Sequence, residues 1–333
     1  MSKRGYEFSF AWIFTLFIGA AVIAAAIMIA TQIVGMKQAE RDAARGLEIG
    51  VLLTPVETAL EDARFAKIIV PDETILFNEV REERPGNPFG SQRIGASIKP
   101  GFNAEWKPLS GVQSTFHNKY IFTPTNETYA EESFYVLAKP LKLPFKIADL
   151  IIIWGGQEKF CFTNPPVEVK AELLELNMTN IYVSNCPTGP EVRNICFGTT
   201  CGGGGISVAI NSDHTGKIVK DGKTLHYVES FGTDRYGLMY AAIFSDPEIY
   251  ERQVSRLMAH AGKLEEIYQR KANSFGSSCY SSNAMSTALG NYKSHTESIA
   301  SGSGGISTAT EARNLFAKAE GVNNANAGAC LLF

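Results

Sequence analysis

The sequence predicts an α+β protein with an N-terminal transmembrane helix and a helical stalk. These lead into a mixed α/β, strand-rich, disulfide-bonded extracytoplasmic domain. Three observations predict this class. Residues 8–36 carry no charged side chain. Segments rich in aromatic and β-branched residues, typical of strands, follow from about residue 67. All six cysteines lie after the apolar run.

The uncharged run over residues 8–36 is long enough to cross a membrane. As a helix it would extend roughly 43 Å, which exceeds the roughly 30 Å apolar core of a bilayer. Only a helix satisfies its own backbone groups in lipid, and the apolar core of a cleaved signal peptide is usually only about 7–15 residues. We therefore expect one membrane span after a short lead-in, residues 1–7, with membrane lipid as a partner.

Small residues recur along this predicted helix. Alanines at i,i+4 spacing allow close approach of two helix backbones in lipid, where no hydrophobic drive brings helices together. The helix-packing candidates are Ala20, Ala21, Ala24 and Ala25. We expect packing against other transmembrane helices, from a second copy or a partner subunit; the alternative is a lone helix that merely contains alanine.

Cysteines decide the predicted orientation, because basic residues flank the run on both sides. An even number of cysteines on one side of the membrane is typical of an oxidising compartment, with 15 possible pairings. The disulfide candidates are Cys161, Cys186, Cys196, Cys201, Cys279 and Cys330. Two glycosylation sequons, at Asn126 and Asn177, also indicate an exterior location. The prediction is a single-pass cell-membrane protein with a cytoplasmic N-terminus and an extracytoplasmic C-terminal domain.

The tripeptide Lys3-Arg4-Gly5, directly before the apolar run, resembles the processing signal of archaeal type IV pilins and pilin-like proteins. The resemblance covers about the first 35 residues. It implies cleavage after the glycine and bundling of the apolar helices into a filament core. The chain departs from the pattern at the fifth mature position, where Phe10 stands in place of the family's usual glutamate.

A helical stalk is predicted over residues 37–66. Apolar residues recur at helical spacing over 37–53. Thr54-Pro55-Val56-Glu57 then forms a capping box, which begins a second helix over 55–66. The same segment would also serve as the first helices of the globular domain.

The predicted extracytoplasmic domain spans residues 67–275. Alternation and β-branched or aromatic content indicate strands over 67–70, 74–80, 94–99, 113–123 and 132–138. The apolar run 150–154, closed by two glycines, is typical of a strand buried on both faces. A helix from 164–166 to 176 and a strand over 181–184 complete a strand–helix–strand unit, which favours a mixed α/β core.

The second half of the domain begins with a cysteine-rich loop, 185–205, followed by a strand over 206–210. Asp221-Gly222 predicts a hairpin, because a type I′ turn needs positive φ at both positions. A helix with one apolar face is expected from Asp246-Pro247 to about Ser274. Low hydrophobicity predicts a long Ser/Gly-rich loop over 276–307, and a capping box at 308–311 predicts a C-terminal helix and tail, 308–333.

Composition and motifs indicate no cofactor, metal or nucleic-acid partner. A net charge of −3 does not suit a nucleic-acid surface. Cys196 and Cys201 lack the second ligand pair of a zinc site, so disulfides are favoured. Gly202–Gly205 lacks the Gly-Lys-Ser/Thr ending of a phosphate loop.

The function expected from these observations is that of a structural or interaction protein, not an enzyme. It would be a pilin-like or envelope-assembly subunit that associates through its transmembrane helix. The alternative is a membrane-anchored extracytoplasmic hydrolase that uses His214 or His226. A histidine within hydrogen-bond reach of a serine or cysteine in a cleft would favour the hydrolase.

Overall fold

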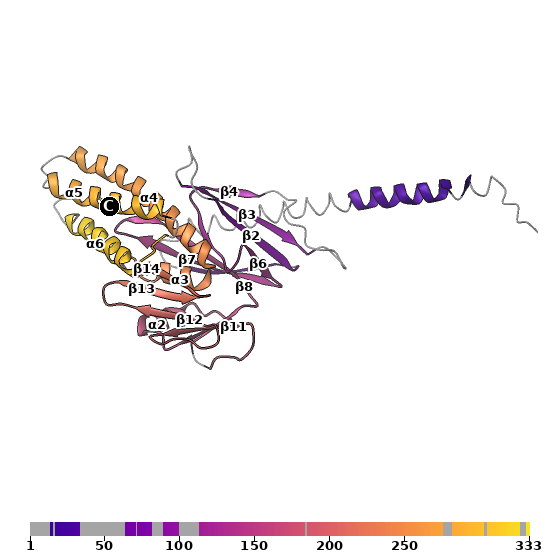
Figure 1. Cartoon of the computed structure of the whole chain (residues 1–333), viewed down its shortest axis with the longest axis horizontal. Helices are drawn as coiled ribbons and strands as arrows, with labels where there is room; N and C mark the ends of the chain where they lie inside the picture. Colours follow the sequence, from indigo (N-terminus) through magenta and orange to yellow (C-terminus); the bar gives the residue numbers. More distant parts are fainter. Residues whose placement is uncertain are drawn as a thin grey trace, which may run out of the picture.

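A computed structural model describes the chain in ten stretches. These are residues 14–15, 17–33, 64–70, 72–81, 89–99, 113–183, 185–275, 282–302, 305–326 and 331–333. The part that follows the N-terminal helix is a mixed α+β structure with three sheets among the described residues (Figure 1). The predicted strand-rich α+β domain and its disulfide bonding are confirmed.

The predicted membrane span lies only partly on described residues. Residues 14–15 and 17–33 are helical, and their side chains are exposed. Within the stretches that the structure describes, no helix is both long and apolar enough to cross a membrane. The rest of the span and the predicted stalk up to residue 63 lie outside the described residues.

The predicted helix over 55–66 is wrong at its end. Strand β1, Arg64–Ile69, covers those positions and pairs antiparallel with β7 from Arg64 opposite Ala138 to Ile69 opposite Ser133. The Phe65 ring stacks on Tyr135 of β7 at 5.4 Å, and this contact favours the sheet over a continued helix. The extracytoplasmic domain therefore includes residue 64, slightly before the predicted boundary.

Two four-stranded sheets form the first half of the domain. One has the order β1-β7-β8-β5 and the other β4-β3-β2-β6. The new strands are β2 (Thr74–Arg81), β3 (Ser91–Ile98), β4 (Ser114–Phe116), β5 (Tyr120–Phe122), β6 (Glu127–Ala130), β7 (Ser133–Lys142) and β8 (Lys146–Gly155). The single strand predicted over 113–123 is two strands, β4 and β5, which lie in different sheets.

Strand β8 is buried on both faces, as its apolar run predicts. Ile151 and Ile153 join the apolar cluster between the two four-stranded sheets. Leu150, Ile152 and Trp154 face the opposite way, into the larger core shared with the helices and the third sheet. The alternation of side chains along a strand thus makes β8 the boundary between the two cores.

The third sheet has six strands in the order β10-β9-β11-β12-β13-β14. Its strands are β9 (Lys159–Thr163), β10 (Ile181–Tyr182), β11 (Val192–Phe197), β12 (Ile206–Ile210), β13 (Thr215–Lys220) and β14 (Lys223–Val228). The predicted hairpin turn is confirmed, with φ of 52° at Asp221 and 75° at Gly222. The predicted loop 185–205 is wrong over β11, which pairs with both β9 and β12.

Five helices follow the sheets or connect their strands in the described part of this domain. They are α2 (Val167–Glu175), α3 (Gly237–Phe244), α4 (Pro247–Phe275), α5 (Ser282–Ser301) and α6 (Ala309–Ala325). Figure 1 shows α4, α5 and α6 side by side. The predicted loop over 276–307 is wrong, because α5 occupies most of it and packs Leu289 and Tyr292 into the core.

The capping predictions for the last helix are confirmed. The Glu311 backbone amide donates to the Thr308 hydroxyl at 3.1 Å. The Glu311 carboxylate in turn accepts a hydrogen bond from the Ser307 backbone amide at 2.8 Å. Helix α6 packs on β13 and β14, so the C-terminal segment belongs to the same core as the domain before it.

Candidate functional site

A groove of about 720 Å³ lies between α2, strand β1 and the turn that precedes α3. This volume falls in the range of roughly 300–1,000 Å³ that small-ligand sites occupy. The groove is lined by Phe65, Glu168, Ala171, Glu172, Glu175, Leu176, Thr233, Asp234, Arg235 and Tyr236. Carboxylates are the commonest charged groups in this lining.

Helix α2 supplies most of the acidic wall. It begins after Pro165-Pro166, and its buried side, Val169 and Leu173, packs into the large core. Glu168, Glu172 and Glu175 recur at helical spacing and line the groove. Residues at i, i+4 and i+7 share one side of a helix, so the spacing alone places the three carboxylates together.

Lys139 of β7 lies fully buried, at 0% exposure, and joins both walls of the groove. Its ammonium group forms an ion pair with Glu172 of α2 and lies 3.1 Å from the Asp234 carboxylate. The Tyr240 hydroxyl donates to the other Glu172 oxygen at 2.9 Å. Burial lowers the pKa of Lys139, and the Asp234 charge opposes that effect. The buried cation therefore fixes α2 against the turn that carries Asp234.

A second charged cluster adjoins the groove through Arg235. The guanidinium pairs with the Glu229 carboxylate, whose side chain is only 2% exposed. The His214 Nδ1 atom lies 2.9 Å from the same carboxylate. The hydrogen bond from Glu229 raises the pKa of Arg235. Arg235 is thus committed to a buried carboxylate at one end of the groove.

The Asp213–His214 turn, one of the predicted catalytic positions, contacts α6. The His214 ring stacks on Phe316 at 4.6 Å, and Phe231 stacks on the other ring neighbour, Phe316, at 5.1 Å. The Asp213 carboxylate lies 3.2 Å from Nε of Arg313. These contacts attach α6 to the third sheet.

The predicted hydrolase site is not assembled by the described histidines. The hydrogen bonds of their rings go to the Gly90 carbonyl, Tyr120, Glu229 and the Glu311 carbonyl, and none of these partners is a serine or cysteine side chain. His226 lies in β14, where burial lowers its pKa. The hydrolase alternative stays a prediction without a supporting arrangement in the described part of the chain.

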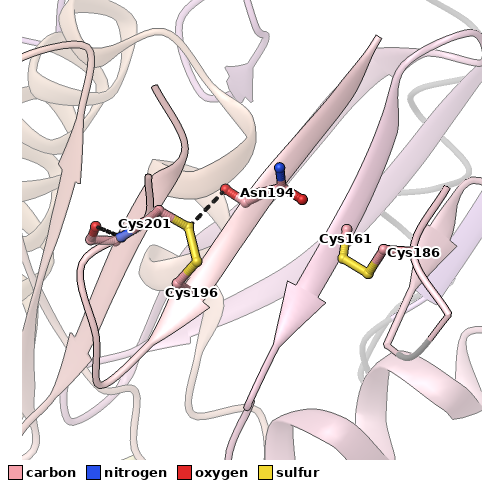
Figure 2. Close-up of a disulfide and its surroundings, with 6 residues drawn as sticks. Cys161, Cys186, Asn194, Cys196 and Cys201 are labelled. Atoms are coloured by element: carbon pink, nitrogen blue, oxygen red, sulfur yellow. Dashed lines mark hydrogen bonds between the residues drawn. A yellow bond between two sulfur atoms is a disulfide. The ribbon is translucent and has the colours of Figure 1, made fainter. Parts of the chain in front are cut away.

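Two disulfides cross-link the third sheet (Figure 2). Cys161 of β9 pairs with Cys186, and Cys196 of β11 pairs with Cys201. Cys161 lies opposite Asn194 in the parallel register of β9 and β11, so Asn194 and Cys196 lie on the same sheet face as Cys161. Sγ of Cys201 is 3.5 Å from the Asn194 carbonyl oxygen. Both bridges thus lie on the face opposite Phe160 and Phe162 of the core.

The other predicted site residues are placed as follows. Cys279 and Cys330 lie outside the described residues. Asn126, before β6, and Asn177, after α2, are both exposed. Ala20, Ala21, Ala24 and Ala25 lie on the exposed helix 17–33. Within the described stretches, no group of three or more His, Cys, Asp or Glu side chains is arranged to hold a metal ion.

The acidic groove was missed by sequence reasoning. A usable signal was present in α2, whose glutamates repeat at 168, 172 and 175 beside apolar positions. Asp234 and Phe65 gave no such signal, because the fold alone brings them beside this helix. A comparison of the chain with protein-family models, curated proteins and solved structures finds no match.

Proposed function

We propose that the chain is a single-pass, membrane-anchored extracytoplasmic structural or interaction protein. In this proposal the uncharged run 8–36 inserts into the bilayer, and the α+β domain is displayed outside the cell membrane. The observation that carries the proposal is the exposed apolar surface of helix 17–33. Its large side chains include Phe17 at 70% exposure and Met28 at 67%. An apolar surface of this kind is typical of a segment that contacts lipid or another helix.

The disulfides support an oxidising compartment for the domain. Disulfides persist mainly in extracellular, periplasmic or comparable environments. All four cysteines that the structure describes are paired. The exposed side chains of Asn126 and Asn177 are compatible with glycan attachment at the surface.

Association through the membrane helix is the assembly part of the proposal. Ala21 and Ala25 lie one helical turn apart, and a pilin-like or envelope-assembly subunit would use such a surface to pack helices closely. Gly19 has open space where a Cβ would lie, so the small-residue surface is free of contacts from the described domain.

Thiol labelling of intact cells, with a membrane-impermeant maleimide, tests the proposed topology. Before reduction, at most the two cysteines outside the described stretches should react; after denaturation and reduction, all six should. A single cysteine introduced at Ser2 should stay protected until the membrane is permeabilised. Labelling of Ser2→Cys in intact cells, or free reaction of the four paired cysteines, would contradict the proposal.

Cross-linking in the membrane tests association. Ala21→Leu with Ala25→Leu adds bulk to the small-residue surface, so the cross-linked assembly should decrease. Val22→Leu with Ile29→Leu is the matched control, because it changes neighbouring large apolar side chains only slightly. Equal assembly of both double variants would remove the helix-packing argument.

A further inference from the structure

Helix α2 exposes an apolar ridge beside its acidic wall. Val167 is 80% exposed and Leu174 is 60% exposed, and the exposed Ala171 lies between them at helical spacing. Single exposed apolar residues are ordinary on protein surfaces. Here three of them follow one line of a helix whose other apolar side is already buried in the core.

The groove itself carries excess negative charge. Five carboxylates belong to it or to its adjoining cluster: Glu168, Glu172, Glu175, Asp234 and Glu229. Two cations, Lys139 and Arg235, oppose them. The ion pairs recorded for this part of the chain use Glu172, Asp234 and Glu229, which leaves the carboxylates of Glu168 and Glu175 to face the groove.

Aromatic side chains complete the walls. Phe65 of β1 lies on one side, and Tyr236, before α3, lies on the other. Such rings accept the methylene chains of lysine and arginine and attract their cationic ends. Arg235 already lies over the Tyr236 ring at 5.8 Å, so the chain itself provides one contact of this kind.

We propose that this groove and the ridge beside it form the docking surface for a cationic amphipathic peptide segment of a partner protein. Lysine or arginine side chains of the segment pair with Glu168 and Glu175. Its apolar side covers Val167, Ala171 and Leu174. The inference goes beyond membrane anchoring, because every residue it uses belongs to the α+β domain.

Charge separates this partner from other classes. Nucleic acids and anionic lipid headgroups would be repelled by the five carboxylates. An acidic peptide would meet the same repulsion. A purely polar cation would leave the apolar ridge uncovered, so both parts of the segment contribute to binding.

Fluorescence anisotropy with the full-length chain in nonionic detergent tests the proposal. The probe is a short labelled peptide with lysine and leucine at helical spacing, and detergent alone is the blank. A glutamate–leucine peptide of the same length and an oligolysine are the comparison probes. The lysine–leucine peptide should bind most tightly, and its affinity should fall as NaCl rises from about 50 mM to about 500 mM, because salt screens exposed charges.

Variants assign the binding to the groove. Glu168→Gln with Glu175→Gln should weaken binding at least tenfold, and Leu174→Ser should weaken it without removing the salt dependence. Glu127→Gln with Glu320→Gln removes the same charge at exposed positions that do not line the groove, and should leave affinity unchanged.

Melting curves show that each variant is folded before its affinity is interpreted. Unchanged affinity in the folded groove variants would overturn the proposal. Equal weakening in both charge pairs, or comparable binding of the glutamate–leucine peptide, would overturn it as well. None of these results depends on whether helix 17–33 enters a membrane, so failure here is distinguishable from failure of the proposed anchoring.

Discussion

The ammonium group of Lys220, at the end of β13, donates a hydrogen bond of 2.7 Å to the carbonyl oxygen of Ser245. A second bond, of 2.9 Å, goes to the Ile243 carbonyl. These carbonyls end α3, where the last helical carbonyls lack intrahelical partners and a positive group is favourable. Burial lowers the pKa of Lys220 to about 8. A buried lysine thus caps a helix whose side chains are all buried.

Lys220→Met should destabilise the domain, because two buried carbonyls lose their donor. Leaving a buried polar group unsatisfied costs about 1–3 kcal/mol, and we expect a loss in that range. Chemical denaturation measures it. Lys223→Met, across the same hairpin and half-exposed, is the control and should change stability little. Equal effects of the two substitutions would refute the capping role.

Arg256 joins α4 to the strands through backbone carbonyls instead of through an acid. Its guanidinium donates to the carbonyls of Phe89 at 2.8 Å, His117 at 3.1 Å and Lys119 at 3.2 Å. It also donates to the Gln253 side chain at 2.6 Å. The group is 4% exposed and lies 4.9 Å from the centre of the Tyr120 ring. One side chain therefore satisfies three buried loop carbonyls.

Arg256→Met should cost about 3 kcal/mol or more, since several carbonyls lose their donor at once. Arg256→Lys should recover only part of this loss, because an ammonium group lacks the planar fork of donors. Thermal and chemical unfolding measure both. Arg252→Met, one turn earlier on the exposed side of α4, is the matched control. A loss no larger than in that control would show that water replaces the guanidinium.

Local signals in the sequence were sufficient for several elements. The Asp221-Gly222 turn requires positive φ, which few other residue pairs allow, and it formed as predicted. The apolar face of α4 repeats over many turns, so Val254, Leu257 and Ala261 were correctly placed in the core. The Thr308 cap is specified by side-chain chemistry within four residues. In each case a short segment carries its own physical cause.

Other elements depend on contacts that no short segment contains. Helix α3 is a uniformly apolar segment of eight residues, and periodicity cannot distinguish such a run from a buried strand. In α5, serine, glycine and asparagine mask a regular series of buried residues: Met285, Leu289, Tyr292, Thr296 and Ile299. That spacing of four and three was a signal for a packed helix. Low hydrophobicity was the wrong criterion, because small residues pack well between helices.

The two disulfides should differ in their contribution to stability. Cys161 and Cys186 are 25 residues apart, whereas Cys196 and Cys201 are 5 apart. In the chain-entropy model the longer loop is worth roughly 3.5 kcal/mol and the shorter one roughly 2 kcal/mol. Cys161→Ser with Cys186→Ser should therefore lower the melting temperature more than Cys196→Ser with Cys201→Ser. The reverse order would show that the Cys196–Cys201 bridge stabilises the native turn itself.

Glu265 of α4 is a buried carboxyl group without a hydrogen-bond partner among the described residues, and so is the hydroxyl of Tyr292 on α5. The Glu265 side chain belongs to a residue that is 1% exposed. Burial raises its pKa to about 10, Lys293 opposes the shift and Glu297 adds to it. The carboxyl group therefore keeps its proton in the folded protein at neutral pH. Since it lies between two packed helices, ionisation would place an unpaired charge in the core.

Glu265→Gln should make the protein more stable than the wild type at pH 8 and remove part of its pH dependence. The folded pKa, about 10, lies above the usual 4.5, so the unfolded chain releases this proton as pH rises through 5 to 8 while the folded chain retains it. The stability that Glu265 contributes is complete below pH 4.5 and falls with rising pH, by on the order of 1 kcal/mol per unit. Glutamine cannot ionise, so the stability difference between variant and wild type should grow across this window. Glu266→Gln is the control. Hydrogen bonds from Lys293 and Lys263 lower the pKa of Glu266 to about 2, so its charge is the same in both states above pH 5. Urea titrations at pH 5, 6.5 and 8 give the three stabilities, and a Glu265→Gln difference that stays constant with pH would mean that this carboxyl is ionised in the folded protein.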